Sequence, residues 1–275
     1  MESVKLEDFI GFDSIVEGFS KRAENNSLSH AHLIVGPDGI GKSILAKIFS
    51  LKILNKSIDR DYVDIVKYKP KKASFGVDEV RAIIEEVNKK PYEGNKKVII
   101  IYEGNKLTVQ AQNALLKTIE EPPHYAVILL LTENVNTFLP TILSRCVTLQ
   151  LKPVAPQLIK KYLMEQLSIP DYLAELSASF SQGNVGKAIR YASSEEFSEI
   201  KKDTVHMLKH VDEMKNYEIV QFIKSMAEKK KEVYDYLDLM LLWYRDVLMF
   251  KVTQDTTTAS NPNNHTLLFS SLPWL

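Results

Sequence analysis

The chain has 275 residues, 45% of them hydrophobic and 25% charged, which is ordinary for a globular protein of two or three modest domains. The 35 Lys and Arg residues balance 35 Asp and Glu residues, and this balance argues against strong overall attraction to nucleic acid. Cys146 is the only cysteine, which excludes an internal disulfide and a zinc site built from several cysteines.

The first part of the chain alternates apolar runs with amphipathic stretches. The runs predict five strands, at 31–35, 62–66, 97–101, 126–132 and 146–151. The stretches between them predict helices at 43–54, 77–90 and 108–121, the last with Thr108 as its N-cap. Strands that are apolar at every position and separated by helices are typical of a parallel sheet covered on both faces. We therefore expect an α/β domain over residues 1–153.

The second part of the chain is helical throughout. Successive patterns at 156–167, 170–180, 185–192, 197–210, 215–230 and 232–252 have no strand between them. The polar segment 193–199 predicts a boundary between a small helical domain, 154–194, and a C-terminal helical domain, 195–275. The second of these ends in a polar tail that we expect to be flexible.

Two features bear on localisation. Five charged residues interrupt the apolar stretch 233–252, which predicts a buried helix instead of a membrane span. The first twelve residues, MESVKLEDFIGF, contain acids where a secretion signal needs a basic head and an apolar run. We expect a cytoplasmic protein with no membrane partner.

The segment GPDGIGKS, residues 36–43, matches G-x-x-x-x-G-K-[ST] at every fixed position and lies between a predicted strand and a predicted helix. Its glycines, Gly36, Gly39 and Gly41, allow the backbone to curl so that amide groups and the helix N-terminus face a phosphate. Lys42 can reach the β- and γ-phosphates, and Ser43 can ligate magnesium. A chance glycine turn is the weaker alternative, so a nucleotide, ATP or ADP with Mg²⁺, is the expected cofactor.

Several segments together resemble the clamp-loader branch of the AAA+ ATPases. They are the stretch 11–43, the helix NALLKTIEEPP at 113–123, the strand AVILLLTEN at 126–134 and LPTILSRC at 139–146. Within this branch the resemblance is strongest to delta-prime subunits of bacterial DNA polymerase III, and GVDEVR at 76–81 belongs to the same pattern. The resemblance implies an AAA+ domain, a helical lid and a helical collar that takes part in oligomerisation.

The resemblance also implies roles for single residues. Arg145, within Ser-Arg-Cys, corresponds to an arginine finger that acts on the nucleotide of a neighbouring subunit. Thr132 corresponds to the polar sensor 1 residue, and Glu103 to the Walker B glutamate. Tyr102 stands where the magnesium-binding aspartate is expected, and a phenol, neutral near pH 7 with a pKa of about 10, cannot replace a carboxylate. Glu103 is therefore either a catalytic remnant or simply a charged residue at a strand end.

Two further departures concern other parts of the family pattern. Gly186 occupies the position of the sensor 2 arginine, with Lys187 one residue further on. The segment 55–68 is short and lacks the four-cysteine zinc module of many members, so no zinc is expected. His206 and His210 stand four apart on a predicted helix without a third ligand at suitable spacing, and we expect no metal site there.

The resemblance implies a clamp-loader subunit of delta-prime type that helps load the sliding clamp onto primed DNA, and Tyr102 predicts little or no ATPase activity of its own. Its partners would be the other subunits of a five-membered hetero-oligomeric ring, with the clamp contacted indirectly and DNA through the complex. The first alternative is an ATP-hydrolysing motor subunit of the same machine. The second is a free-standing P-loop ATPase unrelated to replication, for which a finger acting on a neighbour would be useless.

Overall fold

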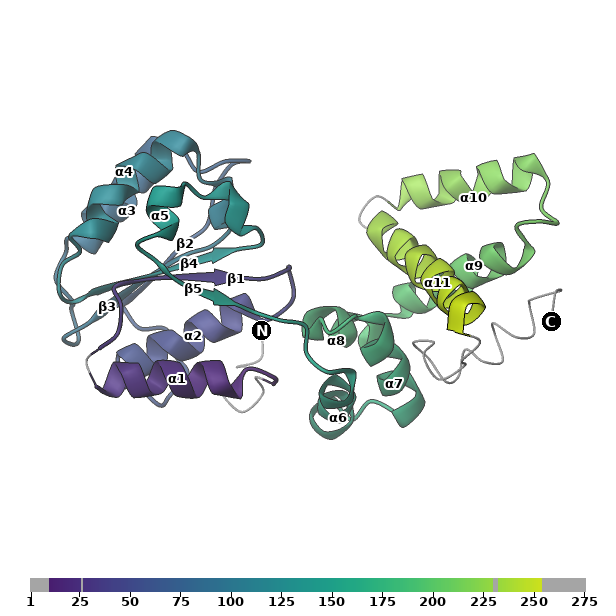
Figure 1. Cartoon of the computed structure of the whole chain (residues 1–275), viewed down its shortest axis with the longest axis horizontal. Helices are drawn as coiled ribbons and strands as arrows, with labels where there is room; N and C mark the ends of the chain where they lie inside the picture. The colour runs from purple at the N-terminus through teal and green to yellow at the C-terminus, as the bar shows by residue number, and fades with distance from the viewer. Residues whose placement is uncertain (1–9, 26, 230–231, 254–275) are drawn as a thin grey trace. The chain divides into compact units, whose positions relative to one another are not determined.

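The computed structural model describes residues 10–25, 27–229 and 232–253 (Figure 1). The chain divides into two compact units, one up to Val154 and one from Ala155 onward. This division falls one residue from the predicted end of the α/β domain. The further boundary predicted near residue 194 stays a prediction, and the predicted flexible tail at 256–265 lies outside the described residues.

The first unit is built on the predicted parallel sheet. Its strands are β1 Ala31–Val35, β2 Ile65–Tyr68, β3 Lys97–Ile101, β4 Ala126–Thr132 and β5 Val147–Gln150. They lie in the order β2-β3-β4-β1-β5, and all neighbouring strands run parallel. Every residue of β1, β3 and β4 is buried, whereas β2 and β5 at the edges are partly exposed. The continuous apolar runs therefore mark the middle of the sheet, as a parallel arrangement requires.

Helices cover both faces of this sheet (Figure 1). On one face lie α1 Asp13–Glu24 and α2 Lys42–Ile53, joined by Phe19, whose ring stacks on that of Phe49 at 3.5 Å between centroids. On the other lie α3 Val77–Val87, α4 Val109–Glu120 and the short α5 Pro140–Leu143. Thr108 caps α4 as predicted, because its side chain accepts a hydrogen bond from the Ala111 amide at 3.2 Å. The helices α1 and α5 were not among the predicted elements.

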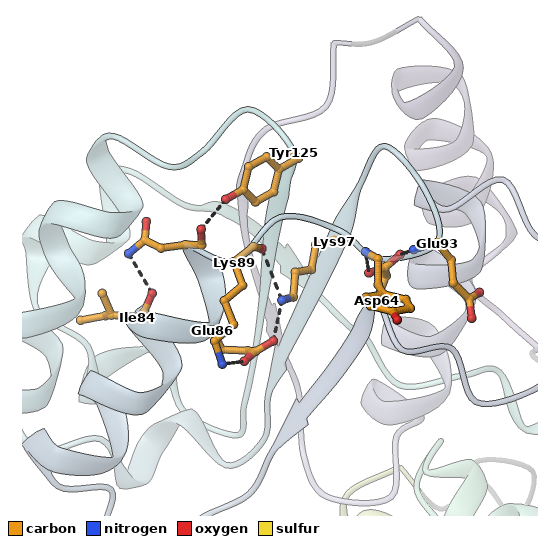
Figure 2. Close-up of polar contacts among 9 residues, drawn as sticks. Asp64, Ile84, Glu86, Lys89, Glu93, Lys97 and Tyr125 are labelled. Carbon is orange, nitrogen blue, oxygen red and sulfur yellow. Dashed lines mark hydrogen bonds and ion pairs between the residues drawn. The ribbon is translucent and has the colours of Figure 1, made fainter.

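The second strand is shifted from its predicted position, 62–66. Pairing with β3 begins at Ile65 opposite Val98 and ends at Tyr68 opposite Ile101. Asp64 precedes the strand, and its buried carboxylate accepts hydrogen bonds from the amides of Tyr92 at 2.6 Å and Glu93 at 2.8 Å (Figure 2). The partner strand, not the local apolar pattern, therefore sets where β2 begins.

A charged cluster joins the end of α3 to the start of β3 (Figure 2). The Lys97 side chain is only 5% exposed, and its ammonium donates to Glu86 at 2.5 Å and to the Lys89 carbonyl at 3.4 Å. Lys89 also pairs with Glu86, at 2.7 Å. Hydrogen bonds from Lys89 and then Lys97 hold the pKa of Glu86 below its ordinary value. This cluster stabilises the edge of the sheet where the strands begin.

The second unit contains only helices among its described residues. They are α6 Pro156–Leu167, α7 Asp171–Phe180, α8 Val185–Ser193, α9 Glu195–His210, α10 Asn216–Glu228 and α11 Val233–Thr253. One apolar cluster is shared by α7, α8, α9 and α11 through Phe180, Tyr191, Phe197, Ile200, Tyr236, Leu239 and Leu242. None of the helices in the part of the chain that is described is long and apolar enough to cross a membrane.

The last helix, α11, differs from its prediction of burial on most sides. Tyr236, Leu239 and Leu242 are buried, but a second apolar stripe at helical spacing is exposed. It consists of Tyr234, Leu237, Leu241, Tyr244, Leu248 and Val252. The chain by itself therefore buries one face of this helix and leaves the other open, and burial of that second face against a partner chain stays a prediction.

Candidate functional site

The residues predicted to handle nucleotide gather at the edge of the sheet where the strands end. The phosphate loop follows β1, and the register pairs Val35 of β1 with Thr132 of β4. On the other side of β4, Leu130 pairs with Ile101 of β3, which leads into Tyr102 and Glu103. Ligands of open α/β sheets bind at this edge. Topology thus brings together the phosphate loop, Thr132 and the end of β3.

The phosphate loop has a backbone that requires its glycines. Gly39 and Gly41 adopt positive φ angles of 81° and 107°, and Gly41 is the residue before α2. A side chain at Gly36 would bring its Cβ within 2.9 Å of the Ile40 side chain. The resulting curl and the N-terminus of α2 form a cradle suited to phosphate.

Lys42 lies over this loop at the first position of α2. Its ammonium donates hydrogen bonds to the carbonyls of Gly36 at 2.8 Å and Pro37 at 2.9 Å. Burial lowers the pKa of Lys42, and the carboxylates of Asp38 and Glu133 partly offset this effect. The ammonium is thus held by neutral loop carbonyls and remains able to exchange them for phosphate oxygens.

Thr132 is 1% exposed at the end of β4. Its carbonyl accepts a hydrogen bond from the Gly36 amide at 3.1 Å. Its hydroxyl donates to the Asn134 carbonyl at 3.1 Å and accepts from the Asn134 amide at 3.3 Å. The threonine therefore joins β4 directly to the phosphate loop, and its role as sensor 1 stays a prediction.

The end of β3 does not provide the usual anchor for magnesium. Tyr102 is half-buried, burial raises the pKa of its phenol, and the Lys69 ammonium lies 4.8 Å from its ring centroid. Glu103 adopts a positive φ of 53° and forms an ion pair with Lys106. Ser43 remains as one oxygen donor, but a phenol beside a lysine and a paired carboxylate do not fit the Mg²⁺ site of an ordinary P-loop enzyme. The phosphate cradle fits a nucleotide, whereas the donor set for the metal does not fit.

Arg145 lies in the turn between α5 and β5, and its guanidinium has three partners on its own chain. Its Nε atom forms an ion pair with Glu120 Oε1 at 2.8 Å. The Nη1 group donates to the Thr141 carbonyl at 3.0 Å and to Ser144 Oγ at 3.1 Å. The side chain is 40% exposed, so it is ordered and still accessible.

Comparison with known proteins agrees with this arrangement of motifs. The family model described as "DNA polymerase III, delta subunit" matches residues 12–155. The DNA polymerase III subunit delta' of Bacillus subtilis (strain 168) is 30% identical over 248 residues, which cover 83% of this chain and 74% of that protein. This chain belongs to the DNA polymerase III delta-prime family. The predicted resemblance to clamp-loader subunits is therefore confirmed.

Other similar proteins are consistent with membership of this clamp-loader family. The DNA polymerase III subunit tau of the same B. subtilis strain is 27% identical, over 90% of this chain and 50% of its own length. A gamma-subunit-related protein from Thermotoga maritima matches in structure with a TM-score of 0.53 at 22% identity, covering 81% of this chain and 76% of its own. The RuvB branch-migration motor of T. maritima also has a TM-score of 0.53, at 19% identity over 74% and 66% of the two chains. The last two likenesses support the AAA+ fold.

The helix α8 departs from the family pattern, because Gly186 stands where a sensor 2 arginine is expected. Lys187, next to the sensor 2 position Gly186, forms an ion pair with Asp238 of α11. Arg190, one turn further along α8, forms another with Asp235, which is buried. The cations of α8 are therefore bound within the helical unit.

Sequence reasoning missed two residues of α4 that hold the segment around Arg145 in this delta-prime family member. Glu120 is the ion-pair partner of Arg145. Gln112 is buried, donates to the carbonyls of Leu107 at 3.1 Å and Thr137 at 2.9 Å, and accepts from the Leu139 amide at 2.8 Å. The sequence offered a signal only for Gln112, which is a polar residue on the apolar face of an amphipathic helix.

We assigned no function to Cys146, His206 or His210. The Cys146 thiol is partly buried, and burial raises its pKa to about 11, which disfavours the thiolate. The rings of His206 and His210 lie 4.7 Å apart. Among the described residues, no group of three or more potential ligands includes them.

Proposed function

We propose that this chain is the delta-prime-type subunit of a bacterial clamp loader and helps place the sliding clamp on primed DNA. It acts in the cytoplasm as one member of a five-subunit hetero-oligomeric ring. It meets the clamp indirectly and DNA through the complex. Its main chemical contribution is Arg145, offered to the nucleotide of a neighbouring subunit.

The contrast between Arg145 and the end of β3 carries this proposal. The guanidinium has fixed partners and 40% exposure, so it can reach a molecule outside the chain. The chain's own site has a phosphate loop but Tyr102 in place of a metal-binding carboxylate. A finger stabilises charge that develops on a neighbour's phosphate and does not require turnover in its own subunit.

The same contrast argues against the alternative of a motor subunit. A motor needs Mg²⁺ to neutralise the phosphate charge that develops during hydrolysis. It also uses a sensor 2 arginine, whereas this chain has Gly186 there and engages the adjacent Lys187 with Asp238. We propose that the loop binds ATP or ADP and that this nucleotide serves structure more than catalysis.

The open face of α11 supports the proposed partnership. Leu237, Leu241, Tyr244 and Leu248 are between 43% and 68% exposed at helical spacing, and Tyr217, Val220 and Ile223 of α10 are 48–58% exposed. Isolated surface apolar residues are ordinary, but two such rows in one helical unit are typical of a surface that another chain covers. We propose that this unit takes part in the collar of the ring.

The decisive experiment is Arg145→Ala in a reconstituted loader. In this loader, the phosphate-loop lysine of every motor subunit except the one next to Arg145 is replaced by alanine. Only the site next to this chain can then hydrolyse ATP. We expect ATP turnover at that site to fall by about 10³-fold or more, the usual contribution of a finger. Clamp loading on primed DNA, followed by fluorescence, should fall with it.

A matched control uses Arg81→Ala. Arg81 is an arginine of the same unit that is 69% exposed and pairs with Asp78 on α3. This variant should assemble, hydrolyse ATP and load clamps like the starting protein. Unchanged turnover and clamp loading in an assembled Arg145→Ala loader would refute the proposed role.

A further inference from the structure

The guanidinium of Arg145 is oriented by its own chain through two of its three nitrogens. Glu120 Oε1 lies 2.8 Å from Nε in an ion pair, and Nη1 donates hydrogen bonds to the Thr141 carbonyl at 3.0 Å and to Ser144 Oγ at 3.1 Å. Among the described residues, none forms a hydrogen bond with Nη2. Because the group is planar, fixing Nε and Nη1 also fixes the direction in which Nη2 points.

Helix α4 supports the finger segment at both ends. Near its start, Gln112 binds the carbonyl of Thr137 and the amide of Leu139. Eight residues later, about 12 Å along the helix, Glu120 binds Arg145. Between these points, Ile142 of α5 is 1% exposed in the core. The segment 137–145 is therefore attached to one rigid element, which is how a side chain is held in a fixed geometry.

The Glu120–Arg145 pair is exposed enough to leave the finger usable. The two side chains are 42% and 40% exposed, so water screens the pair and keeps it weak. The neighbouring Glu121 is also exposed, and within the described part of the chain its side chain makes no polar contact. Of the two adjacent glutamates that end α4, the geometry singles out Glu120.

We propose that Glu120 is a positioning residue for Arg145. Its carboxylate holds Nε so that Nη2 faces outward, toward a phosphate of the neighbouring subunit's nucleotide, before that subunit docks. A donor fixed before the reaction needs no reorganisation as charge develops, which is the basis of electrostatic stabilisation of transition states. This inference rests on the proposed finger role of Arg145.

The test uses the same reconstituted loader with one active neighbouring site. Glu120→Ala should lower kcat at that site about threefold to fivefold, the scale of an exposed ion pair. The KM for ATP should stay within about twofold, because only an interaction made in the transition state is weakened. Glu120→Gln should retain part of the rate, because its amide oxygen can still lie beside Nε but carries no charge. Glu121→Ala is the matched control and should have no effect.

A double variant separates positioning from any other role of Glu120. In the Arg145→Ala background, Glu120→Ala should cause no further loss, because the group that it orients is absent. An equal loss in both backgrounds, or no loss in either, would overturn the positioning role while leaving the finger in place. If Arg145→Ala itself leaves turnover unchanged, the proposed function fails first. Thermal unfolding and loader assembly of each variant show that the comparison is between folded proteins.

Discussion

Two parts of the α/β unit differ in how complete their interactions are. The finger half is Arg145 with its partners, and the nucleotide half is the phosphate loop with the end of β3. The finger half is complete: Arg145 has three partners on its own chain, and two residues of α4 hold its segment. The nucleotide half has an intact phosphate loop but ends β3 with Tyr102 and a Glu103 paired to Lys106. The difference teaches that one fold can retain the binding part of a P-loop site without the usual metal anchor, which is what we expect if its chemistry is, as we propose, delivered to another subunit.

Lys42→Ala should have the largest effect of the substitutions that separate the two halves, and it should affect only the nucleotide half. A hydrogen bond to a charged group contributes about 1.5–3 kcal/mol, so nucleotide affinity of the chain should fall about 10- to 150-fold. Titration with a fluorescent ATP analogue measures this loss. The same variant in the loader should leave ATP hydrolysis at the neighbouring site within about twofold. A large loss there would show that the two halves are not separable.

Tyr102→Asp should have the next largest effect, because it returns the carboxylate that the site lacks. We expect ATP binding by the starting chain to be nearly the same in Mg²⁺ and in EDTA. The aspartate variant should bind about tenfold more tightly in Mg²⁺ than in EDTA, about 1.4 kcal/mol of metal-dependent affinity. Tyr102→Phe is the control and should remain indifferent to the metal. Strong Mg²⁺ dependence of the starting chain would contradict our description of β3.

Glu103→Gln should have little or no effect on the isolated chain, because we expect its ATP turnover to be slow or absent from the start. The carboxylate pairs with Lys106 and has no metal anchor beside it. Steady-state phosphate release from purified protein measures the rate. If the purified chain turned over several ATP per second and this substitution abolished that activity, the chain would be a motor subunit. The contrast between the two halves would then be wrong.

Glu86→Gln should leave both functional halves unchanged and alter stability alone. It removes the charge that compensates Lys97, whose side chain is 5% exposed, at the opposite edge of the sheet. Breaking a fully buried pair costs about 3–5 kcal/mol of unfolding free energy, and we expect about 2 kcal/mol here because Glu86 is 22% exposed. Urea unfolding measures this cost, and ATP affinity and finger activity serve as the readouts that should not change.

The pH dependence of this variant has a definite sign. The folded pKa of Glu86 is below its ordinary value of about 4.5, so its stabilisation is present above that pH and is lost as pH falls through the folded pKa. The stability gap between the starting protein and Glu86→Gln should therefore be constant near neutral pH and shrink below about pH 4.5. A gap that widens on acidification would mean that Glu86 is not stabilised as an anion.

The sequence by itself determined the elements that depend on local pattern. Apolar runs located the buried strands β1, β3 and β4, the glycines and Lys42 located the phosphate loop, and Thr108 located the start of α4. These follow from residue spacing and backbone preference, which act over a few positions. Membership of the delta-prime family was equally readable, because its motifs are contiguous segments.

Only the tertiary structure decided which distant residues meet and which faces remain open. The start of β2 depends on its register with β3, and the open stripe of α11 depends on what the rest of the chain covers. Glu120 and Arg145 are 25 positions apart, and packing of α5 beside α4 brings them within 2.8 Å. A glutamate at a helix end and an arginine in a turn are ordinary in any sequence, because hydrogen-bond geometry exists only after the elements have packed.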